Sequence, residues 1–194
     1  MSVEPSSTVS VDQSHADAAR DIVGRDINNT TINNAAPLAA GVVEQLLQKL
    51  HAEKEQDQRA CETIDRLQRY YIQRAHDGVL GLEAKLKQAG REQSYVDAIE
   101  MKEMFVKLLE QWSLYASAQQ IFVYLLARAE RQFNDMILPQ ISTLGVVGVN
   151  QLMSELIVEP TVKECGASVF AIDHNTAMGM IYWLAEQCFV RWHR

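Results

Sequence analysis

The sequence predicts a mainly α-helical bundle with long antiparallel helices and a short N-terminal β arm. Two patterns lead to this expectation. Apolar residues recur at helical spacing on both sides of Gly90, from about Pro37 onward. Before Pro37, three isoleucines recur every five residues, a period that belongs to neither a helix nor a single strand. The chain is therefore expected to divide into a polar tail and β arm over residues 1–36 and a helical domain over residues 37–194.

The N-terminal arm is predicted over residues 21–34, where isoleucines at intervals of five stand among asparagines. Such spacing is typical of short β segments stacked across tight bends, with asparagines at the corners. An element this small needs partners, because an isolated pair of strands is only marginally stable in water. We expect the arm to pair between copies of the chain, and a merely flexible tail is the alternative. The predicted oligomerisation residues are Ile22, Ile27, Asn28, Asn29, Ile32 and Asn33.

The helical domain is expected to begin with a helix over residues 38–89, which contain an apolar stripe and no proline. Gly78 and Gly81 are the weak points of this helix, where a break or kink is expected. Gly90 is suited to the position after a helix end, and Ser94 resembles the start of a capping box. The sequence therefore predicts a long antiparallel helix pair that reverses near Gly90.

Residues 94–138 contain neither glycine nor proline, so they predict one very long helix or two helices joined near residues 113–117. Pro139 is expected to end this stretch. A short helix is expected over residues 149–158, and Pro160 should break it.

The C-terminal part of the chain predicts a capped helix followed by a strand-like segment. Asp173 or Asn175 is expected to cap the last helix, because both side chains accept hydrogen bonds from a first helical turn. Residues 188–192 then alternate between large apolar and other residues, as in a strand.

Composition narrows the class of protein. Hydrophobic residues make up 47% of the chain, which is enough for a core, and the net charge of -7 argues against a general phosphate-binding surface. Residues 1–20 lack the apolar region of a signal peptide, and the longest apolar run, residues 121–127, is too short to span a membrane. The cysteines lack C-x-x-C spacing. A cytoplasmic protein with reduced thiols and no membrane partner is expected.

No catalytic motif stands out in the sequence. There is no glycine-rich phosphate loop, no G-x-S-x-G and no H-E-x-x-H. The candidate metal ligands in the sequence are Cys165, His174, Cys188 and His193, but their spacing matches no familiar zinc-binding pattern. We therefore expect no enzyme activity, no cofactor and no metal.

A local group of basic residues is the candidate nucleic-acid contact. These residues are expected on one helix beside Tyr70 and Tyr71, whose rings could stack on bases. The net negative charge of the chain makes direct nucleic-acid binding the weaker interpretation. The residues are Arg59, Arg66, Arg69 and Arg74.

Two windows of the sequence resemble a known family. From Gly179 to Trp192 an apolar helix is followed by Cys188 and an alternating segment that a tryptophan closes. Near the N-terminus, Gly24-Arg25-Asp26-Ile27-Asn28 is similar to a Gly-Asp-Ile-Asn arm with an arginine inserted. Both features resemble the helical domains of bacterial ABC three-component conflict systems, the group that includes Lamassu-type defence.

This resemblance implies a non-catalytic accessory or assembly subunit of an anti-phage or anti-plasmid defence complex. Such a subunit would bridge an ABC or SMC-like ATPase and an effector, and it would also associate with itself through the arm. The alternatives are a stand-alone helical signalling adaptor that assembles through a β-stacking arm, and a nucleic-acid-sensing module. Any nucleic acid would be bound mainly by the partner subunits of the complex and not by this chain. The expected partner-binding residues are Tyr182, Trp183, Phe189 and Trp192.

Overall fold

A computed structural model describes residues 41–60, 64–74 and 78–193 of the chain. The predicted N-terminal β arm and its oligomerisation residues lie outside the described residues, so their role stays a prediction. Residues 39–194 form one compact unit that is distinct from residues 1–38, and the description below concerns that unit.

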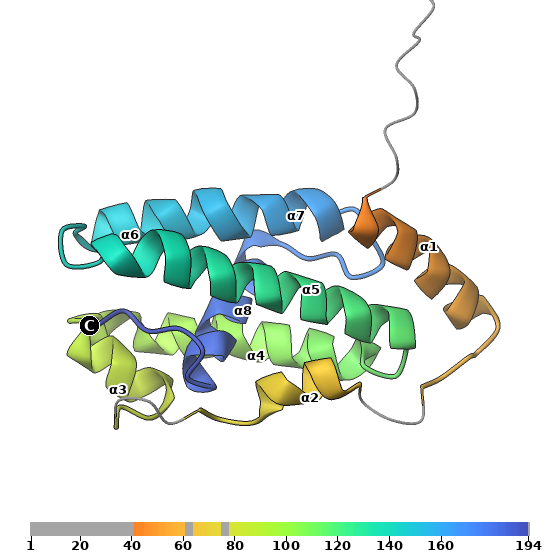
Figure 1. Ribbon diagram of the computed structural model, residues 1–194, viewed down its shortest axis with the longest axis horizontal. Helices are drawn as coiled ribbons and strands as arrows, with labels where there is room; N and C mark the ends of the chain where they lie inside the picture. The colour runs from red at the N-terminus through yellow and green to blue at the C-terminus, as the bar shows by residue number, and fades with distance from the viewer. Residues whose placement is uncertain (1–40, 61–63, 75–77, 194) are drawn as a thin grey trace, which may run out of the picture. The chain divides into compact units, whose positions relative to one another are not determined.

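The described residues form a mainly helical domain, which confirms the predicted class, and Figure 1 shows how the helices are arranged. The π-helical turn η2 and the 3-10 turn η3 extend α5, and the π-helical turn η4 joins α6 to α7. In chain order the elements are α1 (Val42–Glu55), α2 (Asp65–Tyr71), α3 (Gly81–Gln88), η1 (Glu92–Ser94), α4 (Tyr95–Trp112), α5 (Ala116–Gln132), η2 (Phe133–Ile137), η3 (Leu138–Gln140), α6 (Val146–Met153), η4 (Ser154–Val158), α7 (Glu159–Cys165) and α8 (His174–Glu186).

The predicted helix over residues 38–89 is wrong, because α1, α2 and α3 occupy this part of the chain. Residues 53–59 are almost entirely polar and offer no apolar stripe that a continuing helix could bury. Tertiary hydrogen bonds replace the helix here. The backbone N–H of Ile64, for example, donates to the side-chain oxygen of Gln119 on α5 at 2.6 Å. The break expected at the two glycines is confirmed, since Gly78 and Gly81 both have positive φ angles, 76° and 80°.

The reversal predicted at Gly90 is confirmed. Gly90 has a φ of 65°, and the N–H of Arg91 donates to the carbonyl of Leu86 at 2.8 Å, as in a Schellman end of α3. The capping box predicted from Ser94 is wrong: the side chain of Ser94 makes no capping hydrogen bond, because the 3-10 turn η1 leads directly into α4. The predicted long helix pair is also wrong at this point, since α3 is only 8 residues long.

The long antiparallel helices are α4 and α5, which are separate helices joined through residues 113–115. Pro139 lies in the final 3-10 turn of the α5 extension, where the helical stretch ends as predicted. The break predicted at Pro160 is wrong, because α6, η4 and α7 follow one another without a gap. Pro160 lies in the first turn of α7, directly after a π-helical turn. The wider π turn gives room to the backbone carbonyls that a proline ring would otherwise meet.

α1 is attached to α5 through a buried carboxylate. The side chain of Glu53 accepts hydrogen bonds from the backbone N–H of Ser117 at 3.1 Å and from its hydroxyl at 2.8 Å. Ser117 lies in the first turn of α5, where backbone N–H groups have no partner within the helix. Glu53 therefore caps α5 from a distance, and its negative charge also suits the positive end of the helix dipole.

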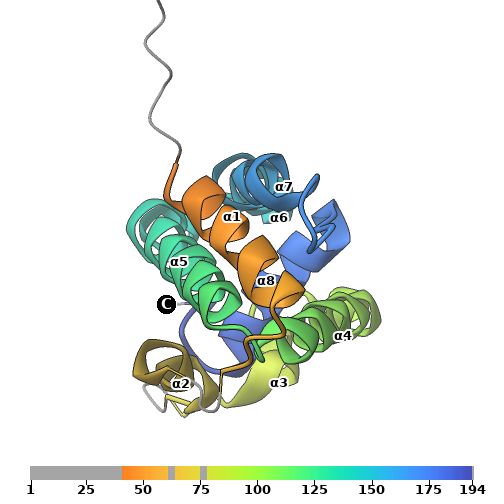
Figure 2. The same ribbon diagram turned by 90° about the vertical axis from the view of Figure 1, so that its right-hand side faces the viewer.

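α8 is the central helix of the domain, as Figure 2 shows, and it contacts α3, α4, α5, α7 and η4. Its most extensive contact is with α4. Asp173 caps α8 as predicted, by accepting a hydrogen bond from the N–H of Thr176 at 2.7 Å, and this bond lowers the pKa of the Asp173 carboxyl. Gly179 lets α4 and α8 approach closely, since a Cβ atom there would overlap the backbone carbonyl of Met101.

Candidate functional site

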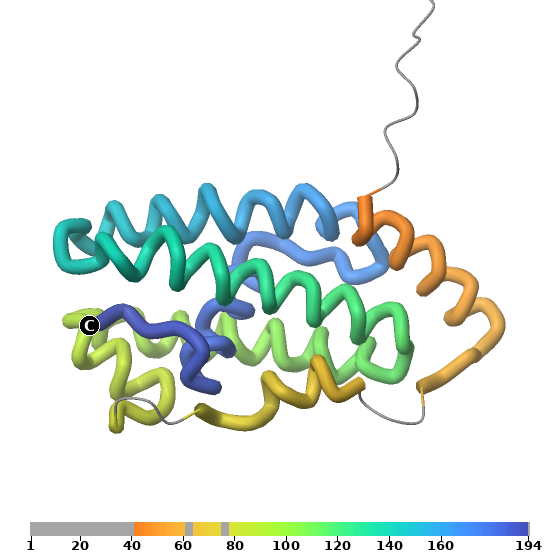
Figure 3. The backbone as a smooth tube through the Cα atoms, in the orientation of Figure 1, coloured from red at the N-terminus to blue at the C-terminus, as the bar shows by residue number. Residues whose placement is uncertain are grey.

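The C-terminal segment, residues 187–193, closes the domain. Cys188 has a φ of 63°, and the N–H of Phe189 donates to the carbonyl of Leu184 at 2.8 Å, which ends α8 in a Schellman turn. Figure 3 shows the segment running from α8 back towards the reversal between α3 and α4. The predicted strand-like alternation is wrong, because Phe189 and Val190 are adjacent and both buried, and the segment joins no sheet among the described residues.

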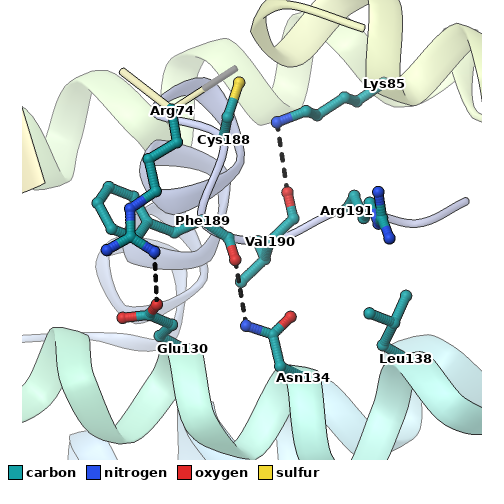
Figure 4. A pocket seen from close by; sticks show the side chains of 9 residues that line it. All are labelled: Arg74, Lys85, Glu130, Asn134, Leu138, Cys188, Phe189, Val190 and Arg191. Carbon is teal, nitrogen blue, oxygen red and sulfur yellow. Dashed lines mark hydrogen bonds and ion pairs between the residues drawn. The ribbon is translucent and has the colours of Figure 1, made fainter. Parts of the chain in front are cut away.

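Side chains from two helices hold the main chain of this segment. The ammonium group of Lys85, on α3, donates to the carbonyl of Ala185 at 2.5 Å and to that of Val190 at 3.4 Å. Asn134, on η2, donates through Nδ2 to the carbonyl of Phe189 at 3.2 Å (Figure 4). The carbonyls of Phe189 and Val190 follow the end of α8, and that of Ala185 also accepts the N–H of Cys188, so these side chains fix the course of the main chain after the helix.

Glu130, on α5, holds α2 and the segment that follows it close to Phe189. Arg69 approaches both carboxylate oxygens of Glu130, at 3.1 and 3.2 Å, and Arg74 approaches one at 3.6 Å. The hydroxyl of Tyr70 donates to the same carboxylate at 3.0 Å. Burial, followed by the charge of Glu130 and this hydrogen bond, raises the pKa of Tyr70 to about 12. The guanidinium of Arg74 also lies 4.3 Å from the ring centre of Phe189.

These contacts change the interpretation of the four arginines that the sequence suggested for nucleic acid. They do not lie on one helix: Arg66 and Arg69 are on α2, Arg74 follows α2, and Arg59 lies between α1 and α2. Arg59 pairs with Asp57 at 2.9 Å, while Arg69 and Arg74 share Glu130. Arg66 and Arg69 are both exposed on α2. Much of the expected positive charge is therefore balanced within the domain.

A hollow of about 350 Å³ lies beneath the C-terminal segment, and Figure 4 shows the side chains around it. The cationic side chains that line it come from three parts of the chain: Arg74 after α2, Lys85 on α3 and Arg191 on the C-terminal segment. Glu130 is the acidic residue in the lining. Among the described residues that line the hollow, cationic side chains therefore outnumber carboxylates.

The four aromatic residues predicted to bind a partner are in the core, where each is at most 8% exposed. Trp192 packs on Tyr182, with ring centres 5.7 Å apart, and Trp183 packs on Phe105 at 5.8 Å. The ring nitrogen of Trp192 is buried and has no hydrogen-bond partner among the described residues. Phe189 lies between Tyr70 and Arg74. These rings stabilise the domain and leave little surface for a partner.

Cys165 and His174, two of the four residues that come nearest to a zinc-ligand pattern in the sequence, lie in different surroundings. Cys165 is buried on α7, and burial raises the pKa of its thiol to about 12, with a further contribution from Glu164. His174 is exposed at the start of α8 and pairs with Glu159 at 3.2 Å. In the part of the chain that the structure describes, no three His, Cys, Asp or Glu residues group so that they could hold a metal ion. Cys61 lies outside that part.

The beginning of α6 exposes apolar side chains that the sequence analysis missed. Val147 is 80% exposed and Val146 49%, and Met136, on the adjoining turn η2, is 50% exposed. We call these three residues the α6 apolar end. The sequence does carry a signal for it, because no charged residue stands between Asp135 and Glu155. Apolar exposure without charge is typical of the centre of a protein–protein interface.

The α6 apolar end is held by a buried arginine. Arg91, which follows the reversal at Gly90, donates to the side chain of Asn150 at 2.9 Å and to the carbonyl of Val146 at 3.3 Å. Burial lowers the pKa of Arg91, and its guanidinium lies 5.8 Å from the ring centre of Trp192. The position of the exposed valines is therefore tied to the C-terminal segment. Across the described ranges, no helix combines the length and the apolar character that crossing a membrane requires.

Fold and site together define a small, mainly helical domain that is built on a buried central helix and closed by its own C-terminal segment. A family model for C-terminal domain 9 of the ABC-three component (ABC-3C) systems matches residues 81–192, which is more than half of the chain. The chain belongs to this family, and the expected membership of the ABC three-component systems is confirmed. The matched residues run from the start of α3 to Trp192. Comparisons with curated proteins and with solved structures found no match.

Proposed function

We propose that this protein is a non-catalytic accessory subunit of a bacterial anti-phage or anti-plasmid defence complex, in which it bridges an ABC or SMC-like ATPase and a separate effector. The observation that carries the proposal is the family match, since a domain of a three-component system is expected to work with the other components. The matched residues include α6, which carries two exposed valines.

The α6 apolar end is the surface that we assign to a partner subunit. Its three residues are uncharged, and Arg91 holds the turn beneath them in place. A preformed apolar surface binds with little loss of conformational freedom, because the side chains and backbone are already ordered. The partner surface is accordingly apolar and poor in charge, as the centres of stable interfaces are.

The chemistry of the complex would belong to the partner subunits. Within the described ranges, Cys165 is buried with a raised thiol pKa, and His174 pairs with a carboxylate on the surface. Neither arrangement pairs a nucleophile with a base. The paired arginines around Glu130 likewise give little support to the alternative of a nucleic-acid-sensing module.

A charge placed in the α6 apolar end is expected to weaken the complex. The change Val147→Glu alters an exposed side chain, so the domain should stay folded, while a desolvated carboxylate in the interface should lower affinity at least tenfold. The measurement is binding of the full chain to the ATPase and to the effector encoded beside it, each purified separately, by isothermal titration calorimetry.

Val42→Glu is the matched control, because Val42 is also exposed, at the first residue of α1, where a carboxylate suits the helix dipole. Equal affinities for the two variants and the unchanged chain would contradict the assignment of this surface. Binding that only Val147→Glu weakens supports it.

A further inference from the structure

A shallow hollow lies along the exposed side of α5 and adjoins the α6 apolar end. Its volume is about 530 Å³, and all of its lining side chains come from α5 and from the turn η2 that extends this helix. We call it the α5 hollow; the lining residues on which the inference depends are Tyr124, Ala127, Arg128, Arg131 and Met136. We propose that the α5 hollow receives an amphipathic helix of the partner subunit that binds the α6 apolar end. This inference rests on the proposed function and extends its surface.

The small size of the α6 apolar end is the first argument. It consists of three side chains, whereas a stable interface usually takes about 20–30 residues from each partner. The partner must therefore cover further surface beside these three. Met136 belongs both to the α6 apolar end and to the lining of the α5 hollow, so the two surfaces share an exposed side chain.

The shape of the hollow is the second argument. Tyr124, Ala127 and Arg131 are exposed and recur at helical spacing along one side of α5, which lies at the left edge of the domain in Figure 2. The small side chain of Ala127 leaves a gap between the two large ones, into which a side chain of a packed helix can project. A strand fits less well, because the backbone of α5 has its N–H and C=O groups engaged within the helix.

The π-helical turn η2 is the third argument. In an uninterrupted α-helix Met136 would lie about 120° around the helix axis from Tyr124. A π-helical turn has more residues per turn, so it brings Met136 round towards the side of α5 that carries Tyr124 and Ala127. Such turns inside α-helices are frequent at functional sites, and a flexible methionine adapts well to a partner surface. The turn thus joins the exposed side of α5 to the α6 apolar end.

The charges of the α5 hollow are already balanced within the domain. Arg128 pairs with Glu164 on α7 at 2.7 Å, and its guanidinium lies 5.5 Å from the ring centre of Tyr124. Arg131 pairs with Asp135 at 3.2 Å. Side chains that are ordered before binding lose little freedom when a partner docks. The partner helix needs no charge to neutralise this surface, and its contacting side is apolar.

The change Ala127→Glu tests the proposal, because it fills the gap in the hollow with a carboxylate. Ala127 is exposed, and a glutamate there can pair with Arg131 one turn later, so the domain should stay folded, which circular dichroism checks. We expect the affinity for the partner that Val147→Glu weakens to fall about tenfold, since the new carboxylate would be desolvated in the interface. Isothermal titration calorimetry of the full chain with the ATPase and with the effector of the same three-component system measures it. Ala127→Gln fills the same gap without a charge and should weaken the same partner.

Ala84→Glu is the matched control, since Ala84 is exposed on α3 and lies outside the lining of the α5 hollow. Analytical ultracentrifugation of the chain alone accompanies the titrations. Weaker binding of one partner by both Ala127 variants and by Val147→Glu, with Ala84→Glu unchanged, supports a single continuous surface.

Three outcomes would overturn the proposal. If Val147→Glu weakens binding while both Ala127 variants bind as the control does, the α5 hollow is not part of the interface, and the proposed function stands. If the unchanged chain binds neither subunit, the proposed function fails together with this inference. If Ala127→Glu lowers the mass of the chain in the absence of any partner, a second copy of the chain occupies the hollow in place of a partner subunit.

Discussion

The change Gly179→Ala is expected to lower the free energy of unfolding of the helical domain by about 3 kcal/mol, at the upper end of the usual range for overpacked cores. The new methyl group would overlap the backbone carbonyl of Met101 on α4, and a backbone atom cannot move away by changing a rotamer. α8 would have to shift against its most extensive neighbour. In a domain of this size, such a loss lowers the unfolding temperature by roughly 6–12 °C, which thermal circular dichroism measures.

Gly145→Ala is the control for this prediction. Gly145 precedes α6 with a φ of -67°, and a Cβ atom there would meet nothing within 4 Å. We expect its free energy of unfolding to stay within about 0.5 kcal/mol of the unchanged chain. If both alanine variants unfold at the same temperature, the close approach of α4 and α8 described above is incorrect.

The change Glu53→Ala is expected to cost about 2 kcal/mol, because it removes two hydrogen bonds to a charged acceptor and leaves a buried N–H without a partner. Both bonds come from Ser117, which is fully buried in the first turn of α5. Urea unfolding gives the change in free energy. Glu55→Ala, at an exposed position on the same helix, should alter it by no more than about 0.5 kcal/mol. Equal midpoints for the two variants would show that α5 does not depend on this cap.

The sequence predicted those helix ends that depend on one residue and its immediate neighbours. Gly90 and Asp173 do what their residue types favour, because a positive φ and a first-turn hydrogen bond are decided locally. Pro160 is the counterexample, since its effect depends on a π-helical turn that no local pattern announces. The interruption after α1 likewise depends on hydrogen bonds between residues far apart in the sequence, such as Ile64 and Gln119.

The candidate site was harder to predict than the fold. The sequence identified aromatic residues in the C-terminal window, and their burial in the domain core gives them a structural role. Lys85 and Glu53 were missed because charged residues are rarely buried. A signal did exist, since each stands three residues after a buried leucine, Leu82 and Leu50, and therefore on the buried face of its helix. Arg91 had no such signal, because its partners come from α6 and the C-terminal segment.

The central claim is that this chain joins the other components of an ABC three-component system. The most direct test is native mass spectrometry of the purified ATPase and effector of the same three-component system, mixed with and without the full chain. The account predicts that the ATPase and the effector appear in one complex only when this chain is present and is itself part of that complex. Association of the ATPase with the effector to the same extent without this chain would contradict the bridging role.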